Sequence, residues 1–544
     1  MTALSLAGAC APSTFSGITL WGSEVLTLEA SMVTNYSISF PYAYRFTAPS
    51  RDVQNATFCN VTVTYTHPGA NDSINVEAWL PTENWNGRFQ AVGGGGWVAG
   101  RFSLSYGPMA GAVDEGYATI TTDAGLGSAA DAAPWALLSP GNVDLYKLQN
   151  LASVSLNDKA ILGKSLIEKF YGVGPSYSYW NGCSQGGRQG LMLAQRYPNA
   201  YDGLAIGAPA SYWSELLASM FWPQQYMNMI GEYPYGCELD AITAAAISEC
   251  DGLDGAVDAI ISDVEGCRAR FDPFKLVGTT IVCPQTANNS TIQISTAAAS
   301  VANATWSGAV SETGKQLANG LNIGADLTGN SPRNVRQTGI VETNCTGGES
   351  CVGAPIILGT QWLSLFLAKD PTFDFAHLTH KQFERFVHAG RQQYASIIDA
   401  GDPDLSEFRE TGGKILAWHG LADEVIPTKN SERYYDEVSA LVPDIDSFYR
   451  YFPVPGLGHC WGGNGGQPTQ LFAQLRAWVE NGTAPESSRV SFNSSLDGKT
   501  QERLLCPYPR TAQFDAGCGD AAKLECWSCS GVLPEGKWKS LTEL

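Results

Sequence analysis

The sequence predicts an α/β protein in which a mostly parallel sheet is interrupted by a large insertion. Short strands alternate with helices through the first 211 residues, as they do when crossover helices join parallel strands. A strand, a glycine turn and a helix follow one another closely between residues 177 and 197. The strand pattern stops near residue 212 and resumes at 414. We therefore expect one sheet domain built from 1–211 and 412–544, with a second domain inserted at 212–411.

The individual elements follow from periodicity and from the turn residues between them. Residues 60–66 and 74–80 alternate apolar and polar side chains on either side of a turn, which predicts an antiparallel start to a mixed sheet. The insertion is rich in alanine and glycine and has few strand signals, so we expect it to be helical. The other expected elements are strands at 88–92, 117–122, 177–180, 201–209, 414–420 and 449–454, and helices at 145–171, 191–197 and 471–481.

The composition excludes several classes of function. Hydrophobic residues make up 44% of the 544 residues and charged residues 16%, which is typical of a folded protein. The net charge of −20 argues against nucleic acid as a partner, because phosphate binding needs a basic face. No apolar run approaches the roughly 20 residues that cross a bilayer, so we expect no membrane-spanning segment. Nothing in the pattern indicates the oligomeric state.

Cysteines and glycosylation sequons indicate a secreted protein. The fourteen cysteines show no zinc-ribbon spacing, so we expect disulfides, including in the tail that begins at Cys506. Residues 1–9 lack the basic and apolar regions of a signal peptide, so we expect a leader to have been removed. Ten N-x-S/T sequons point to the same compartment: Asn35, Asn55, Asn60, Asn71, Asn288, Asn289, Asn303, Asn344, Asn481 and Asn493.

A G-x-S-x-G motif at 182–186 marks Ser184 as a candidate nucleophile. Taken alone, the motif can arise by chance in a chain with 58 glycines. Its strand–turn–helix context favours a nucleophile elbow, in which the serine sits on a strained turn with its hydroxyl exposed. The small residues at both ends of the motif let strand and helix approach closely. The N–H of Gln185 can then point at a developing oxyanion near the helix N-terminus.

Four consecutive glycines, 93–96, follow the strand at 88–92. Hydrolases with a nucleophile elbow take a second oxyanion N–H from the loop after an early strand, so we expect Gly94 or Gly95 to supply it. The alternative is a loop that is merely flexible. A phosphate-binding loop is excluded, because no Gly-Lys-Ser/Thr follows.

A serine nucleophile needs a histidine base. His459 lies in a glycine-rich loop after the strand at 449–454 and is the strongest candidate. His419 ends the strand at 414–420 and is the close competitor, although a satisfied core residue is the better interpretation for it. We expect structural, packed or surface roles for the other histidines, His67, His377, His380 and His388.

The base in turn needs an acid that orients it, and Asp423 lies just past the strand at 414–420. The order Ser184, Asp423, His459 is the chain order of α/β-hydrolases. The insertion explains the long stretch between the serine and the acid. Three other acids remain open: Glu424, Asp402 and Asp436.

Ser184 and His459 each adjoin a cysteine, Cys183 and Cys460. If the triad forms, the two cysteines come close, and a disulfide would tie the nucleophile loop to the base loop. In this respect the sequence resembles the tannase/feruloyl esterase family, in which the cysteines beside the serine and the histidine are joined. The layout is similar over most of the chain, and the matching segments are 182–188, 419–423, 426–427 and 458–460.

The resemblance implies an α/β-hydrolase core, a large lid inserted before the acid strand, secretion, and hydrolysis of small phenolic esters or plant cell-wall esters. It leaves open whether the acyl group is galloyl or hydroxycinnamoyl. The lid would supply an aromatic pocket for that group. Candidates by position are Trp213, Phe221, Trp222 and Tyr226, although a packed lid core explains these side chains equally well.

A second candidate site is the acidic stretch at 250–261, which carries Asp251, Asp254 and Asp258. The pattern is not an EF-hand, and the spacing alone favours a solvated acidic turn. The resemblance implies a different role, because similar lids hold a structural Ca²⁺ with such aspartates. Its main-chain carbonyl ligands would be Ala256 and Ile260. Cys250 and Cys267 flank the loop and would close it as a disulfide.

The sequence therefore predicts a secreted serine esterase with Ser184, His459 and Asp423 as its triad and no cofactor for catalysis. The alternatives are a tannase that acts mainly on galloyl esters, a serine peptidase, and a non-catalytic glycan-binding protein. The last of these leaves the elbow, the acid–histidine order and the paired cysteines unexplained.

Overall fold

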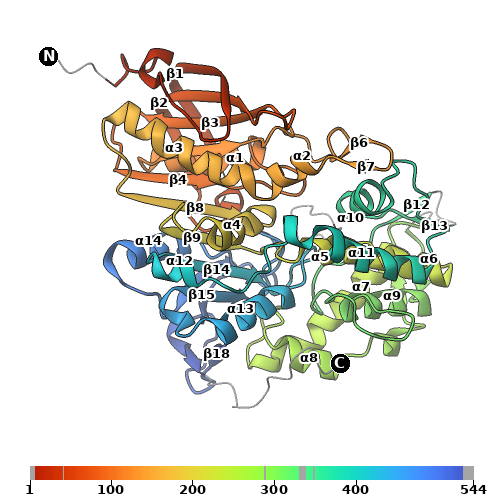
Figure 1. Ribbon diagram of the computed structural model, residues 1–544. Coiled ribbons are helices and arrows are strands. Elements are labelled where there is room, and N and C mark those ends of the chain that lie inside the picture. The colour runs from red at the N-terminus through yellow and green to blue at the C-terminus, as the bar shows by residue number, and fades with distance from the viewer. Residues whose placement is uncertain (1–5, 41, 287–288, 330–338, 347–349, 531–544) are drawn as a thin grey trace.

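The computed structural model describes residues 6–40, 42–286, 289–329, 339–346 and 350–530. Its centre is a nine-stranded mixed sheet with the strand order β1-β2-β3-β5-β4-β8-β9-β14-β15, flanked by helices (Figure 1). The predicted α/β class is confirmed. The strands of this sheet are β1 Glu24–Phe40, β2 Arg51–Thr66, β3 Ile74–Pro81, β4 Arg88–Val92, β5 Ala118–Thr122, β8 Tyr177–Cys183, β9 Gly203–Gly207, β14 Lys414–Gly420 and β15 Tyr449–Val454.

The first part of the sheet is antiparallel, as the alternating pattern predicted. β1 pairs with β2, β2 with β3, and β3 with β5. On β2, Val61, Val63 and Tyr65 are buried while the residues between them are half-buried, because one face of the strand packs toward helix α3 (Ser155–Tyr171). β1 is an edge strand with no fully buried residue along its length.

The rest of the sheet is parallel, from β5 through β4, β8, β9 and β14 to β15, so the carboxyl ends of these strands share one edge. α3, α4 and α13 pack on one face, and α1 and α14 pack on the other. This double cover buries every residue of β9 and all but the first residue of β8 and β14. The covering helices are α1 Ser103–Asp114, α4 Gln185–Arg196, α13 Lys429–Leu441 and α14 Leu471–Asn481.

The sequence predicted helices at 471–481 and 145–171, and the structure confirms the bounds of the first but divides the second. α14 begins and ends at the predicted residues, and Gly482 follows it with a left-handed φ of 70°. The predicted helix at 145–171 is instead three consecutive pieces: α2 (Leu145–Gln149), a wider π-type turn (Asn150–Val154) and α3. Carbonyl groups of this turn accept hydrogen bonds from the buried Arg188, and such an inserted side chain disturbs a regular helical ladder.

Residues 208–413, between β9 and β14, form a mainly helical segment that we call the insert. Figure 1 shows its helices α6, α7, α8, α9 and α11 gathered on one side of the molecule, away from β1 to β3. Its core also contains Trp97 and Trp135, which follow β4 and β5, and Val425 and Ile426, which follow β14. The insert therefore packs over loops at the carboxyl ends of these strands.

The insert contains helices and two short hairpins. Its longer helices are α5 Trp213–Ser219, α6 Trp222–Ile230, α7 Gly236–Cys250, α8 Val264–Arg270, α9 Thr296–Ser307 and α11 His380–Ile398. Its hairpins are β10 Thr280–Val282 with β11 Thr291–Gln293, and β12 Thr343–Thr346 with β13 Ser350–Gly353.

Every cysteine is in a disulfide. Cys506–Cys529 and Cys518–Cys526 cross-link the C-terminal hairpins, as expected for the tail. The other pairs are Cys10–Cys59, Cys183–Cys460, Cys237–Cys283, Cys250–Cys267 and Cys345–Cys351. Within the described ranges, no helix has the length and apolar character needed to cross a membrane.

Candidate active site

Ser184 lies alone on the turn between β8, which ends at Cys183, and α4, which begins at Gln185. Its φ of 63° and ψ of −121° are strained for a residue with a side chain. The turn is tight, since a Cβ on Gly182 would lie only 2.5 Å from the carbonyl oxygen of Gly186. Glycine at this position is therefore required by the close approach of strand and helix.

His459 and Asp423 are paired at the carboxyl ends of β15 and β14. His459 Nδ1 lies 2.8 Å from Asp423 Oδ2, and the other carboxylate oxygen accepts the backbone N–H groups of Val425 and Ile426 at 2.8 and 2.7 Å. Burial alone would raise the pKa of Asp423, but His459 and a second histidine hold it well below its usual range. Asp423 is thus an ionised acceptor in a fixed orientation.

The second histidine is His419, which the sequence analysis interpreted as a core residue. It is indeed fully buried, but its Nε2 lies 3.0 Å from Asp423 Oδ2 and its Nδ1 lies 2.7 Å from Ser431 Oγ. An N–H on Nε2 then donates to Asp423, and Nδ1 accepts from the Ser431 hydroxyl. His419 therefore orients the same carboxylate oxygen that His459 uses. Its position four residues before Asp423 was the sequence signal for this contact.

The other three candidate acids do not contact the His459 ring. Glu424 accepts the backbone N–H of His459 at 2.9 Å, and burial together with the charge of Asp423 raises its pKa well above the usual range. Asp402 accepts the N–H of Asp404, and Asp436 accepts the hydroxyl of Tyr508. Glu424 consequently holds the backbone of the histidine loop, while Asp423 holds its ring.

The disulfide between Cys183 and Cys460 joins the neighbours of Ser184 and His459, with 6.0 Å between their Cα atoms. It links segments 277 positions apart and brings the backbone of the histidine loop beside the serine turn. The Ser184 hydroxyl makes no hydrogen bond to His459 in the described part of the chain. Hydrogen bonds between nucleophile and base are often long before substrate binds and tighten in the Michaelis complex.

The three expected oxyanion donors differ in their availability. Gln185 is the first residue of α4, so its N–H has no acceptor within the helix. In contrast, the N–H of Gly94 donates to Gln189 Oε1 at 3.0 Å, and the N–H of Gly95 donates to the Val98 carbonyl at 3.0 Å. Gly94 and Gly95 could serve an oxyanion only after leaving these acceptors. The oxyanion role of Gly94 or Gly95 therefore stays a prediction.

Gln189, which the sequence analysis did not single out, joins α4 to the loop that follows β4, which we call the glycine loop (residues 93–101). Its side chain is fully buried on α4, accepts from Gly94 N–H, and donates from Nε2 to the Ala99 carbonyl at 3.1 Å. The N–H of Gly186 adds a bond to the Gly94 carbonyl at 3.1 Å. The loop and the helix that begins after Ser184 are therefore held together as one unit.

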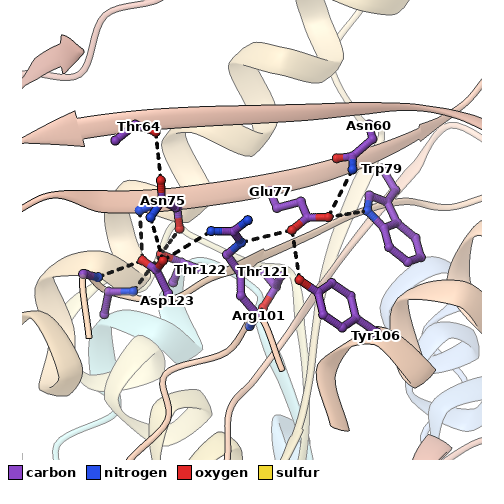
Figure 2. Close-up of polar contacts among 12 residues, drawn as sticks. Asn60, Thr64, Asn75, Glu77, Trp79, Arg101, Tyr106, Thr121, Thr122 and Asp123 are labelled. Carbon is purple, nitrogen blue, oxygen red and sulfur yellow. Dashed lines mark hydrogen bonds and ion pairs between the residues drawn. The ribbon is translucent and has the colours of Figure 1, made fainter. Parts of the chain in front are cut away.

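The far end of the glycine loop is fixed at Arg101, whose guanidinium lies between two buried carboxylates (Figure 2). Its Nε lies 3.0 Å from Glu77 Oε2, and its Nη1 lies 3.3 Å from Asp123 Oδ2. Its backbone N–H also donates to Thr121 Oγ1. Both carboxylates accept further bonds from β2, β3 and the following loops, so the loop is anchored to the antiparallel part of the sheet.

The motifs predicted the strained serine turn and the histidine–carboxylate pair, and the resemblance implied the disulfide between their loops. A family model described as "Tannase and feruloyl esterase" matches residues 59–529. The chain belongs to this family. It is a carboxylic ester hydrolase, which sets the glycan-binding alternative aside.

Similar proteins of the tannase and feruloyl esterase family extend over nearly the whole chain. A probable feruloyl esterase of Arthroderma benhamiae is 37% identical over 488 residues, which is 88% of this chain and 87% of the relative. The tannin acyl hydrolase of Aspergillus niger superposes with a TM-score of 0.83 at 28% identity and covers 97% of this chain and 96% of its own. Feruloyl esterase B of Aspergillus oryzae gives a TM-score of 0.76 at 26% identity, with coverages of 97% and 100%. The α/β-hydrolase type of the fold is thereby established.

The aromatic side chains proposed for the pocket of this family member pack inside the insert. Trp213, Phe221 and Trp222 are almost completely buried, and Tyr226 packs against the same core. Ring contacts account for them, such as Trp213 with Trp97 and Phe221 with Phe375. The packed-core alternative therefore describes these residues.

A cavity of about 330 Å³ lies between the insert and the loops that carry Asp423 and His459, and its volume is in the range of small-molecule sites. Most of its lining is aliphatic or glycine rather than aromatic. The loops contribute Leu421, Ala422, Gly456, Gly463 and Asn464, and the insert contributes the other residues, among them Asp240, Ile247, Ile260 and Ile323.

The acidic loop of the insert is closed by the Cys250–Cys267 disulfide. Its carboxylates are used in several ways: Asp251 accepts the N–H groups of Asp258 and Ile260 at 2.9 and 3.3 Å, and Asp254 accepts that of Ala256. Among the described residues, no three His, Cys, Asp or Glu side chains surround one metal-sized point.

One carboxylate oxygen of this loop is nevertheless suited to a hard cation. Asp254 Oδ2 is buried without a hydrogen-bond partner in the part of the chain that the structure describes. Burial also raises the pKa of Asp258 to about 6, although Arg503 acts in the opposite direction. A buried carboxylate oxygen without a described hydrogen-bond partner is the kind of donor that a hard cation takes.

The contacts of Gln189 with the glycine loop lead to a prediction for this esterase. Gln189→Met keeps the length of the side chain but removes both loop contacts, so we expect kcat to fall about 10- to 100-fold with little change in KM. The reason is that the glycine loop loses its fixed position relative to Ser184. Steady-state kinetics with p-nitrophenyl acetate measure both constants.

Gln195→Met is the matched control. Gln195 lies on the same helix and also donates two hydrogen bonds, to the Ala400 carbonyl and to Tyr434 Oη, but it does not contact the loop. We expect its kcat to stay within about three-fold of the wild type, since the active-site loop is unchanged. If both variants lost kcat equally, general weakening of α4 would explain the result and Gln189 would have no special role.

Proposed function

We propose that this esterase hydrolyses esters of phenolic acids through Ser184, His459 and Asp423. The observation that supports this most is the pairing of His459 Nδ1 with the buried Asp423, on a loop tied by a disulfide to the serine turn. The pairing leaves His459 Nε2 for the serine, which is the arrangement that a general base needs. The related enzymes named feruloyl esterase and tannin acyl hydrolase support the substrate class.

The reaction would proceed in two halves. The Ser184 oxygen attacks the ester carbonyl carbon while His459 Nε2 takes the serine proton. The tetrahedral intermediate collapses, and the alcohol leaves with that proton from His459. Water then attacks the acyl-enzyme with the same histidine as base, and free acid is released. Asp423 stabilises the imidazolium in both halves, and the Gln185 N–H at the start of α4 faces the oxyanion.

The acyl specificity is the finer part of the proposal. Relatives are named for both feruloyl and tannin substrates, so we infer a phenolic acyl group. The acyl carbon must reach Ser184, which is not among the residues that line the 330 Å³ cavity, so we assign that cavity no part of the acyl group. A panel of methyl gallate, methyl ferulate and a peptide anilide tests the acyl specificity. We expect turnover of at least one methyl ester and a rate for the anilide at least about 10³-fold lower. Equal turnover of ester and anilide would favour the serine peptidase alternative.

We also propose a structural Ca²⁺ in the acidic loop. Asp251, Asp254 and Asp258 would hold it together with the carbonyl groups of Ala256 and Ile260. The unpartnered buried oxygen of Asp254 supports this assignment. The ion would neutralise the loop and fix its shape, with no part in the ester chemistry.

Secretion with N-linked glycans completes the proposal. Seven disulfides support an oxidising compartment. Asn35 and Asn55 are exposed and suited to carry glycans, whereas the side-chain nitrogen of Asn60 donates to the buried Glu77 (Figure 2). We therefore expect Asn60 to stay unmodified. The sequon at Asn288 lies outside the described residues.

A further inference from the structure

Arg503 connects the C-terminal hairpin to the acidic loop of the insert. It lies on β17 (Thr500–Leu505), and its Nε and Nη2 both donate to Asp258 Oδ2, the first at 3.0 Å. The two residues are 245 positions apart in the chain. Arg503 is 7% exposed and Asp258 is 1% exposed, so the ion pair is shielded from solvent.

The guanidinium is held from every side. Nη1 donates to the carbonyl groups of Glu502 and Ala521, and Nη2 donates to Gln501 Oε1 at 2.6 Å. The rings of Trp527 and Phe492 lie 4.8 and 5.7 Å from its central carbon. Such a side chain loses little further entropy in holding Asp258, and its charge is fixed in place.

The acidic loop needs positive charge from elsewhere. Asp251 accepts backbone N–H groups of the loop, and Asp254 accepts the Ala256 N–H and a hydrogen bond from the Ser262 side chain; none of these donors is charged. Among the described residues, the ion pair of Arg503 with Asp258 is the one that any of the loop's three aspartates makes. Removing one partner of a buried ion pair is strongly destabilising, because the other charge is left without compensation.

We propose that Arg503 is the permanent cation of the acidic loop and shares Asp258 with a bound divalent cation. The inference rests on the Ca²⁺ site proposed above. Two consequences follow. The loop stays folded when the metal is removed, because Arg503 still neutralises Asp258. The metal binds more weakly than three free aspartates would allow, because a fixed positive charge lies beside one of its ligands.

The test compares Arg503→Met with the wild type as full-length secreted protein, purified in CaCl₂ and then stripped with EDTA. We expect the wild-type unfolding midpoint to fall by only about 2–3 °C in EDTA. The variant should fall by more than about 8 °C and recover when CaCl₂ is restored. Calorimetric titration of CaCl₂ should give a Kd at least about ten-fold lower for the variant than for the wild type.

Arg489→Met is the matched control, since Arg489 lies on the neighbouring strand β16 (Ser488–Asn493) and faces Glu502 at 3.8 Å with half of its side chain exposed. It should keep the wild-type midpoint and Kd. Arg503→Lys serves if the methionine variant does not fold: it keeps the charge, so its Kd for Ca²⁺ should stay within about three-fold of the wild type. A ten-fold tighter Kd for Arg503→Lys would overturn the inference.

The outcomes separate this inference from the proposed Ca²⁺ site. Binding by the wild type and Arg503→Met with equal Kd and equal sensitivity to EDTA refutes the role of Arg503 and leaves the site intact. Binding by the variant alone refutes the sharing, because the wild type would then hold no metal beside Arg503. Absence of binding in both refutes the site and the sharing together.

Discussion

Replacing Ser184 with alanine should lower kcat/KM for p-nitrophenyl acetate by about 10⁶-fold. Without the hydroxyl, His459 and Asp423 have no oxygen to activate, and the rate that remains comes from water attack on a bound ester. A long progress curve at high enzyme concentration measures such a rate. A fluorophosphonate should label the wild type at Ser184 and leave the variant unlabelled. Retention of more than about 1% of activity would place the nucleophile elsewhere.

Backbone strain at Ser184 provides the control for this experiment. The φ of 63° favours glycine, and alanine retains the strain that serine bears. Ser184→Gly should therefore be as inactive as Ser184→Ala but more stable than it by about 1 kcal/mol in urea unfolding. The pair separates loss of chemistry from loss of structure. Equal stability of the two variants would mean that the turn relaxes once the serine is removed.

The parts of the site that sequence reasoning reached are those encoded locally. The G-x-S-x-G motif holds Ser184 and its flanking glycines within five residues. Asp423 and His459 lie just past strands that apolar runs predict, and these strands are now β14 and β15. Parallel strands place such residues along one edge of the sheet, so their meeting followed from topology rather than from any pairwise signal.

The parts that were missed depend on side-chain geometry between distant segments. Gln189 looks like one more polar residue on a helix, yet it crosses to a loop more than 90 residues earlier. The glycine run predicted close approach of the backbone, but it could not show that Gly94 and Gly95 already have acceptors. Arg503 reaches Asp258 across 245 residues, and no periodicity records such a pair.

The aromatic residues of the insert illustrate a related limit. Trp213 and Phe221 were read both as pocket and as core, because periodicity reports burial and not what a side chain is buried against. The structure places them in a core shared with Trp97, which belongs to the loop after β4. That shared core fixes the insert over the loops of the sheet. A composition-based boundary at residue 212 could not predict how the two parts pack.

Asp423→Asn should lower kcat by about 10⁴-fold and leave KM within about two-fold. Asp423 Oδ2 faces two N–H donors, from His459 at 2.8 Å and from His419 at 3.0 Å, while Oδ1 already accepts two backbone N–H groups. An asparagine that keeps its oxygen on the backbone donors must present its NH₂ to both rings. His459 then has to turn its lone pair toward the amide, which leaves its proton on Nε2, where the serine needs a base.

Glu424→Gln is the matched control for Asp423→Asn, because the two acids are adjacent and both buried. Burial and the charge of Asp423 raise the pKa of Glu424, which favours its neutral form, and a glutamine oxygen can still accept the His459 N–H. We therefore expect kcat within about three-fold of the wild type between pH 6 and 8. If Glu424→Gln lost as much kcat as Asp423→Asn, Glu424 would be the acid that the ring requires, and the 2.8 Å contact of His459 with Asp423 would not be the working pair. The Glu424→Gln variant thus tests whether Asp423 is the triad acid, because the two carboxyls lie on one loop and only that of Asp423 faces the His459 imidazole.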